Sequence, residues 1–270
     1  MVIIGDRISA SNPQAREAME RGDREGIMAL ARAQERAGAT HLYVSAGLFH
    51  FDEAARMLWL MDAAQDASRL PLCIDTPSPH AVAAALRAHR HGKPILAGVT
   101  LDEKRLSALA PIIRDANCAV LAACAKEMRQ PAAMGGKPLP AGADERVHIA
   151  RELVSDLASL GVAREDVILD PASPLGEGPR AFPEALETIR RLRAEFPTHR
   201  ILFSPSRLTA NMEHGARLER AALAMAVEAG ARAVMLDPLD TELMETLRAA
   251  RALVEPGAGA GALDGPAALA

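Results

Sequence analysis

Short apolar runs that end in an aspartate recur along the chain. Three of them are Leu-Cys-Ile-Asp at 72–75, Val-Ile-Leu-Asp at 167–170 and Val-Met-Leu-Asp at 234–237. An apolar run without polar alternation is typical of a strand buried on both faces, as in a parallel sheet. A carboxylate at the end of such a strand is costly to remove from water. The pattern therefore predicts that these strand ends together form one polar mouth on an apolar scaffold.

The same pattern predicts eight strands, each followed by a helix. The expected strands lie at 2–5, 41–45, 71–76, 94–100, 118–125, 167–170, 200–204 and 234–237. The expected helices begin near residues 23, 52, 79, 102, 144, 182, 218 and 241. Strict alternation of such units favours an α/β fold of the (β/α)8 TIM-barrel type, with its active site on the loops that follow the strands. A doubly wound sheet is the alternative, but no Gly-x-Gly-x-x-Gly follows the first strand.

Two segments fall outside this alternation. The Gly- and Pro-rich stretch at 134–140 makes a long loop, which in a compact domain more often indicates a functional lid than a linker. Residues 256–270 are rich in Gly and Ala, and we expect them to be disordered. The predicted organisation is therefore a single barrel over 1–255 with a short tail at 256–270.

Composition excludes several function classes. Of the 270 residues, 49% are apolar and 3% aromatic, so the expected core is aliphatic. A net charge of −4 without a basic stripe disfavours nucleic-acid binding. No apolar stretch is long enough for a signal peptide or a membrane span, which predicts a cytoplasmic protein without membrane contact. Cys73, Cys118 and Cys124 lie singly in apolar runs, as expected of reduced core thiols.

Asp75 and Asp170 are the first candidates for a binding site. In a barrel, the third and sixth strands end on opposite sides of the mouth, so both carboxylates can hold one planar ligand. A carboxylate accepts two parallel N–H bonds and suits a ring edge with an amine beside a ring N–H, as in pterin or guanine. The alternative is that each aspartate caps its following helix or pairs with an arginine.

Other chemistries have weaker support in the sequence. The eight histidines form no His-x-His at a strand end and no His-Glu-x-x-His, so we expect no metal in the barrel. A Gly-x-Ser-x-Gly motif is absent, and Ser45, Ser204 and Ser206 have no evident partner histidine, so a serine nucleophile is not indicated.

Four segments, taken in order, resemble the methyltetrahydrofolate:corrinoid protein methyltransferases. They are Ile-Gly-Asp-Arg-Ile at 4–8, Leu-Cys-Ile-Asp-Thr at 72–76, Leu-Asp-Pro at 169–171 and Leu-Ala-Met-Ala at 223–226. That family belongs to the pterin-binding superfamily, together with dihydropteroate synthase and the folate domain of cobalamin-dependent methionine synthase. The resemblance runs from residue 1 to about residue 254.

The resemblance implies a pterin-binding barrel of one-carbon metabolism, usually a homodimer. Such enzymes move the N5 methyl group between methyltetrahydrofolate and the cobalt of a cobalamin, or corrinoid, that a partner corrinoid protein carries. Tetrahydrofolate is then a substrate or product, and the barrel itself needs no metal. Asp75 and Asp170 fall where the family holds the amino and ring N–H groups of the pterin.

The chain departs from the family pattern at three asparagine positions. Ser45 and Thr100 stand where asparagines follow the second and fourth strands, and Ser206 stands where the family asparagine lies near N5. Tyr43 replaces an acidic residue. A shorter hydroxyl has less reach than an amide, and losing an electrostatic donor costs roughly 2–4 kcal/mol.

The predicted site follows from this pattern. Its pterin-binding residues are Asp75, Asp170, Thr100, Ser45 and Asp237, and its catalytic candidates are Ser206 and Arg207.

Two alternatives to a methyltransferase follow from the replaced asparagines. One is a non-catalytic barrel that binds a pterin or a corrinoid partner, and the other is a divergent barrel enzyme with a different ligand. Dihydropteroate synthase fits less well, because Leu208 stands where its Ser-Arg-Lys motif has lysine and its Gly-Gly-Glu-Ser signature is absent.

Overall fold

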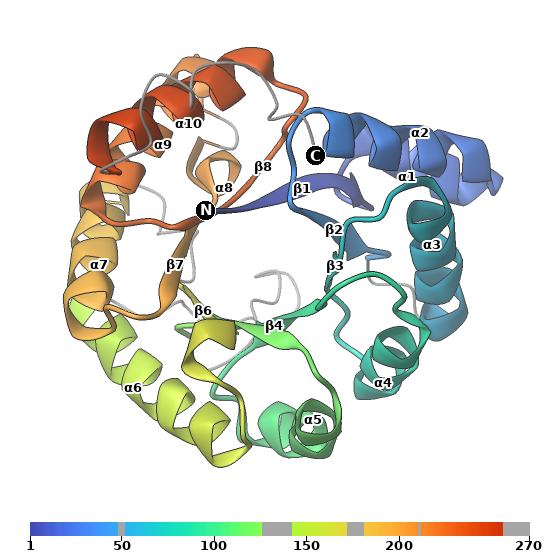
Figure 1. Ribbon diagram of the computed structural model, residues 1–270, viewed down its shortest axis with the longest axis horizontal. Helices are drawn as coiled ribbons and strands as arrows, with labels where there is room; N and C mark the ends of the chain where they lie inside the picture. The colour runs from blue at the N-terminus through green and yellow to red at the C-terminus, as the bar shows by residue number, and fades with distance from the viewer. Residues whose placement is uncertain (48–51, 126–141, 172–180, 210–211, 256–270) are drawn as a thin grey trace.

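Eight parallel strands form a closed barrel, and helices surround it (Figure 1). The computed structural model describes residues 1–47, 52–125, 142–171, 181–209 and 212–255. Each strand pairs with its neighbours in sequence, and the last strand pairs with the first. The strands are β1 (Val2–Ser9), β2 (His41–Ser45), β3 (Leu72–Ile74), β4 (Ile95–Val99), β5 (Ala119–Ala123), β6 (Val167–Asp170), β7 (Arg200–Phe203) and β8 (Ala233–Leu236). The predicted (β/α)8 barrel is confirmed.

The helices follow the strands, with two that the sequence pattern did not predict. They are α1 (Pro13–Arg21), α2 (Arg24–Arg36), α3 (Glu53–Ala67), α4 (Pro79–Ala88), α5 (Glu103–Asp115), α6 (Ala143–Ser159), α7 (Ala181–Glu195), α8 (Pro205–Thr209), α9 (Gly215–Ala229) and α10 (Thr241–Val254), and a 3-10 turn, η2 (Arg164–Asp166), precedes β6. The additional helices are α1 and the short α8.

Side-chain caps start several helices at the mouth of the barrel. The Ser78 hydroxyl accepts a hydrogen bond from the Ala81 amide at the start of α4, at 3.2 Å. The carboxylates of Asp102 and Asp240 do the same for α5 and α10, at 2.7 and 2.9 Å. These caps satisfy amides that have no partner within the helix. They also fix where each loop leaves its strand.

The core has an inner and an outer layer. The inner cluster, which fills the barrel, comprises Ile4, Cys73, Ile95, Ala97, Leu121, Ile168, Leu202, Ala233 and Met235. The outer layer packs strand residues such as Leu96 and Leu169 against the helices. Successive side chains of a strand point to opposite faces. The residue two places beyond an inner one therefore faces inward again, nearer the mouth.

Three further expectations concern the cysteines, the lid and tail segments, and membrane spans. All three cysteines are buried and carry free thiols. The lid predicted at 134–140 and the disordered tail predicted at 256–270 lie outside the described residues. None of the described helices combines the length and apolar character needed to cross a bilayer.

Candidate functional site

Four inward-facing carboxylates surround the mouth of the barrel. Asp75, Asp170 and Asp237 each lie two residues beyond an inner core residue of β3, β6 and β8, namely Cys73, Ile168 and Met235. Asp6 stands in the same relation to Ile4 on β1. The alternation of each strand therefore turns these four carboxylates inward at the mouth end of the barrel, beyond an apolar floor. The predicted polar mouth is present in the structure.

Asp75 is held by a tyrosine from the neighbouring strand. The Tyr43 hydroxyl on β2 donates a hydrogen bond to Asp75 Oδ2. Tyr43 lies opposite Cys73 in the β2–β3 pairing, so its ring packs in the barrel while its hydroxyl reaches the mouth. Burial, and then the negative charge of Asp75, raise the pKa of Tyr43 well above its usual value. Tyr43 therefore remains a proton donor to Asp75 at neutral pH.

Asp170 forms an ion pair with Arg207, one of the two predicted catalytic residues. Arg207 Nη1 on α8 lies 3.2 Å from Asp170 Oδ2. The Asp170 side chain is 9% exposed and that of Arg207 is 36% exposed. Burial opposes the charge of Arg207, but Asp170, Tyr43 and Asp75 outweigh it and raise the pKa of the guanidinium. Arg207 is thus a cation within electrostatic reach of both predicted ligand anchors.

A second arginine fixes the backbone beneath Asp75. Arg105 on α5 donates to the carbonyl oxygens of Thr76, Pro77 and Gly98, at 3.1, 2.6 and 2.9 Å. Gly98 has a φ of 72°, a conformation that favours glycine. Burial lowers the pKa of Arg105, partly offset by the charge on Asp75. Arg105 thereby ties together the ends of β3 and β4.

Asp6 and Asp237 lie at the neighbouring ends of β1 and β8. Arg7 Nη1 lies 3.0 Å from Asp237 Oδ2, and Arg7 Nη2 donates to Gln14 Oε1 at 2.9 Å. Asp237 Oδ1 accepts from the Leu239 amide at 2.9 Å. Asp237 therefore acts both as an arginine partner and as a turn cap, the alternative role considered for a strand-end aspartate. Burial and the charge of Asp237 raise the pKa of Asp6 from 3.8 to about 6.

The remaining predicted residues are more peripheral. Ser45 ends β2 and is partly exposed. Thr100 follows β4, is 2% exposed, and its hydroxyl accepts a hydrogen bond from the Asp102 amide at 3.3 Å. Ser206 lies in α8, directly before Arg207. The structure leaves all three as predictions, with Thr100 engaged in a turn.

The mouth residues that were not predicted as part of the site include Tyr43, Arg105, Asp6 and Arg7. Asp6 shares the strand-end signal of the other aspartates, but Gly5 interrupts the apolar run before it. The role of Tyr43 follows from strand register, and that of Arg105 from the packing of α5. Neither is encoded by spacing within one segment. Among the described residues, no group of His, Cys, Asp and Glu is arranged to hold a metal ion.

Comparison with protein families identifies the barrel. A model of the family described as "Pterin binding enzyme" matches residues 12–237. The chain belongs to the pterin-binding enzyme family. The family resemblance inferred from its sequence motifs is confirmed.

Individual members of known function are distant. The chain is 24% identical over 259 residues to the methylcorrinoid:tetrahydrofolate methyltransferase of Eubacterium limosum, covering 94% of this chain and 91% of that protein. It is 25% identical over 229 residues to methionine synthase of Mycobacterium tuberculosis, covering 80% of this chain but 18% of that longer protein. This pterin-binding chain is therefore a divergent relative of both.

Solved structures with the same fold include dihydropteroate synthases. The enzyme of Xanthomonas albilineans in complex with 7,8-dihydropteroate superposes with a TM-score of 0.67 at 20% identity, covering 93% of this chain and 92% of that one. The Yersinia pestis dihydropteroate synthase gives a TM-score of 0.67 at 15% identity, with coverage of 93% and 92%. At this identity the similarity establishes the barrel fold alone.

Proposed function

We propose that this pterin-binding barrel transfers the N5 methyl group between methyltetrahydrofolate and the cobalt of a corrinoid protein. The observation that carries the proposal is the pair of inward carboxylates, Asp75 and Asp170, with the Arg207 guanidinium in electrostatic reach of both. The name of the Eubacterium limosum relative supports the same reaction. We expect a cytoplasmic homodimer that meets its corrinoid partner at the mouth.

The hydrogen-bonding groups of the mouth are complementary to a pterin. The amino group and the adjacent ring N–H of a pterin are donors, and Asp75 and Asp170 are acceptors. Each carboxylate has about four lone-pair sites, so Asp75 retains capacity beside the Tyr43 hydroxyl. Ser45, Thr100 and Asp237 are the further predicted contacts. The tie made by Arg105 keeps the end of β3 in place before ligand arrives.

Arg207 and Ser206 provide the proposed chemistry near the reacting end. When the methyl group leaves, the electron pair of the broken bond remains on N5, and a nearby cation stabilises that developing charge. Arg207 retains its charge beside Asp170 and supplies such a cation. Ser206 offers a hydroxyl donor where related enzymes use a longer amide. The corrinoid arrives as a substrate on its carrier protein and supplies the methyl-carrying cobalt.

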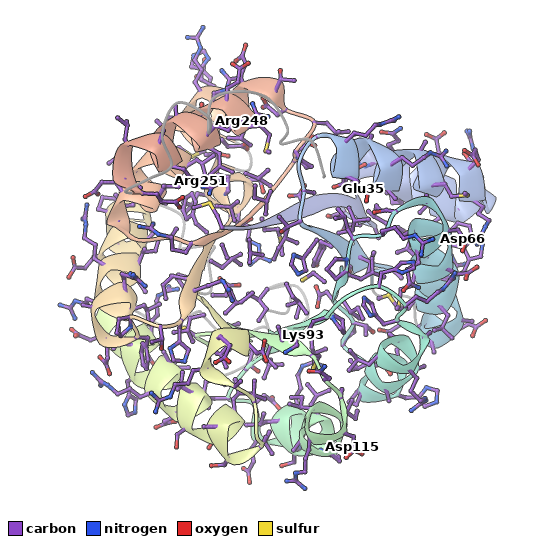
Figure 2. The ribbon with its side chains drawn as sticks, viewed as in Figure 1. Glu35, Asp66, Lys93, Asp115, Arg248 and Arg251 are labelled. Carbon is purple, nitrogen blue, oxygen red and sulfur yellow. The ribbon has the colours of Figure 1, made fainter. Side chains whose placement is uncertain are left out.

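Calorimetric titration of methyltetrahydrofolate into the protein tests the binding half of the proposal. We expect binding in the wild type and a loss of roughly 100-fold in Asp75→Asn and in Asp170→Asn, because two charge-assisted bonds are weakened. Asp115→Asn is the matched control, since Asp115 is an exposed carboxylate at the outer end of α5 (Figure 2). Equal affinity in all four proteins, or none in the wild type, contradicts the assignment.

Turnover distinguishes the enzyme from a binding protein. Incubation with methyltetrahydrofolate and reduced cobalamin should yield methylcobalamin, visible by its absorbance spectrum. Binding without turnover, also in the presence of a corrinoid protein, would favour the non-catalytic alternative. Formation of another pterin product would favour a different enzyme of the same family.

A further inference from the structure

We propose that Asp6 is the proton donor and acceptor of this mouth, exchanging a proton with N5 of the folate. The inference rests on the proposed methyl transfer and assigns a role to a carboxyl group that the pterin-edge contacts do not use. Three features carry it: the inward position of Asp6, the carboxylate beside it, and the engagement of the nearest arginine elsewhere.

Asp6 faces inward at the same end of the barrel as the ligand anchors but on a different part of the rim. In the β1–β8 pairing, Ile4 lies opposite Met235 and Gly5 opposite Leu236, so Asp6 and Asp237 are the next neighbours. A register shift in β1 between Gly5 and Ile8 follows at this point. Asp6 faces inward by regular alternation from Ile4, and Arg7 after it contacts Asp237 at the end of β8.

The charged groups that face Asp6 favour its protonated form. Asp237 on β8 and Glu219 on α9 both raise the pKa of Asp6, and Arg7 on its own strand lowers it less than burial raises it. The two terminal nitrogens of Arg7 are engaged by Asp237 and Gln14. Among the described residues, no other side chain donates a hydrogen bond to Asp6. A carboxyl group with a pKa of about 6 suits proton exchange near neutral pH.

On the opposite side of the rim, the described ends of β4 and β5 carry no comparable group. At the corresponding inner positions, β4 presents Ala97 and β5 presents Ala123. A pterin held by its amino edge at Asp75 and Asp170 carries N5 in its other ring, away from that edge. Among the described residues, the ionisable side chains on the β7–β8–β1–β2 side include Arg207 and Tyr43, which both hold their protons at neutral pH. Asp6 lies on this side too, with its pKa raised to about 6.

The proton balances the transfer in either direction. When the methyl carbon moves to the corrinoid, the electron pair of the N5–carbon bond stays on N5, and the corrinoid supplies the pair for the new bond and is oxidised. The Asp6 carboxyl then gives its proton to N5, directly or through one water. In the opposite direction the N5 pair forms the bond to carbon, the corrinoid regains its pair, and the N5 proton passes to the Asp6 carboxylate.

Titration of the ligand-free protein tests the environment of Asp6 without folate. In protein labelled with ¹³C at the aspartate side-chain carboxyl carbon, we expect a resonance with a midpoint near pH 6 that is missing in Asp6→Asn. Asp237→Asn should lower that midpoint, because it removes the neighbouring negative charge and allows Arg7 to approach Asp6. If no such resonance exists, or if it persists in Asp6→Asn, the proposal is overturned.

The second measurement combines calorimetry with the methyl-transfer rate from methyltetrahydrofolate to reduced cobalamin. In Asp6→Asn we expect binding within about threefold of wild type, a rate lower by about 100-fold, and loss of the acid-side pH dependence. Asp115→Asn should match the wild type in all three. Retained binding with an unchanged pH profile in Asp6→Asn overturns the role of Asp6 alone. Absence of folate binding in the wild type overturns the methyltransferase proposal, and this inference with it.

Discussion

The mouth holds two pairs of carboxylates, and their negative charge is compensated differently. In the β3–β6 pair, Asp75 and Asp170 each have a dedicated donor, the Tyr43 hydroxyl and the Arg207 guanidinium. In the β1–β8 pair, Asp6 and Asp237 lie next to each other, and Arg7 pairs with Asp237. The β3–β6 pair has carboxylates in fixed orientations, as a binding edge requires. The β1–β8 pair includes a carboxyl group that changes protonation near neutral pH.

This contrast has an energetic consequence. A carboxylate with a paired cation or hydroxyl contributes stability in its ionised form, whereas a buried carboxyl beside another carboxylate destabilises the folded chain once it ionises. At neutral pH the β3–β6 pair is therefore expected to stabilise the folded chain, and the ionised Asp6 to destabilise it. Substitutions that remove a charge or a hydrogen-bond donor from either pair test this comparison.

Removing Arg207, the cation of the β3–β6 pair, should have the largest effect on the unfolding free energy. Arg207→Gln removes the guanidinium that lies 3.2 Å from Asp170, a carboxylate whose side chain is 9% exposed. Breaking a largely buried pair costs about 2–4 kcal/mol, reduced here by the partial exposure of the arginine. Urea denaturation at neutral pH measures the loss, and a cost no larger than that of an exposed ion pair would contradict this account of the Arg207–Asp170 pair.

Neutralising Asp6 in the β1–β8 pair should instead increase the unfolding free energy. The pKa of Asp6 is 3.8 in ordinary surroundings and about 6 in the fold, so the folded chain binds more protons between these values. Its unfolding free energy therefore decreases as pH rises through this window and stays lower above it. Asp6→Asn removes that penalty.

We expect Asp6→Asn to be more stable than wild type by roughly 3 kcal/mol above pH 6, with little difference below pH 4. Denaturation curves collected across this range provide the measurement. A variant that is less stable than wild type at pH 8 would show that the ionised Asp6 has a favourable partner after all.

Tyr43→Phe tests the contribution of the Tyr43 hydroxyl, the uncharged hydrogen-bond donor to Asp75. The substitution keeps the ring in the barrel and removes the hydroxyl that binds Asp75. One hydrogen bond to a charged group should cost about 1.5 kcal/mol in unfolding free energy, and up to about tenfold in folate affinity. Calorimetry and denaturation report the two quantities. Tighter folate binding in Tyr43→Phe would mean that the hydroxyl competes with the ligand for Asp75.

The smallest effect is expected for a charge cluster away from the mouth. Arg24 pairs with Asp62 and Asp66 at the surface of α2 and α3, and all three side chains are at least 34% exposed. Arg24→Gln should cost about 0.5 kcal/mol, and the cost should shrink in high salt. Denaturation at low and high ionic strength checks this. A loss as large as that of Arg207→Gln would remove the distinction between mouth and surface charges.

Local pattern predicted most of the fold because most elements depend on local signals. The bounds of β2, β6 and α10 match the expected ones, since apolar runs, a terminal aspartate and a capping residue mark them. The helix α1 was missed because only Ala15, Ala18 and Met19 of its nine residues are buried. Asn12 and Pro13 did signal its start, as the Asn12 side chain caps the Ala15 amide. The five-residue helix α8 is too short for any periodicity.

The candidate site was predictable where it consists of strand ends. Asp75, Asp170 and Asp237 were found from the runs that precede them, and the structure brings all three to the mouth. Their partners were not found, because Tyr43–Asp75 depends on register between strands and Arg7–Asp237 joins residues 230 positions apart. Asp6 was overlooked because β1 continues through a bulge to Ser9, beyond the expected end at residue 5.

The pairing of β1 with β8 also sets an order in time. A ribosome releases β1 before the other seven strands and β8 after them, so Arg7 meets Asp237 only when all eight strands have been made. The Asp75–Tyr43 contact needs only the first third of the chain. The neighbouring carboxylates Asp6 and Asp237 therefore come together only when the ring closes. Proton exchange at the mouth would then be a property of closed barrels alone.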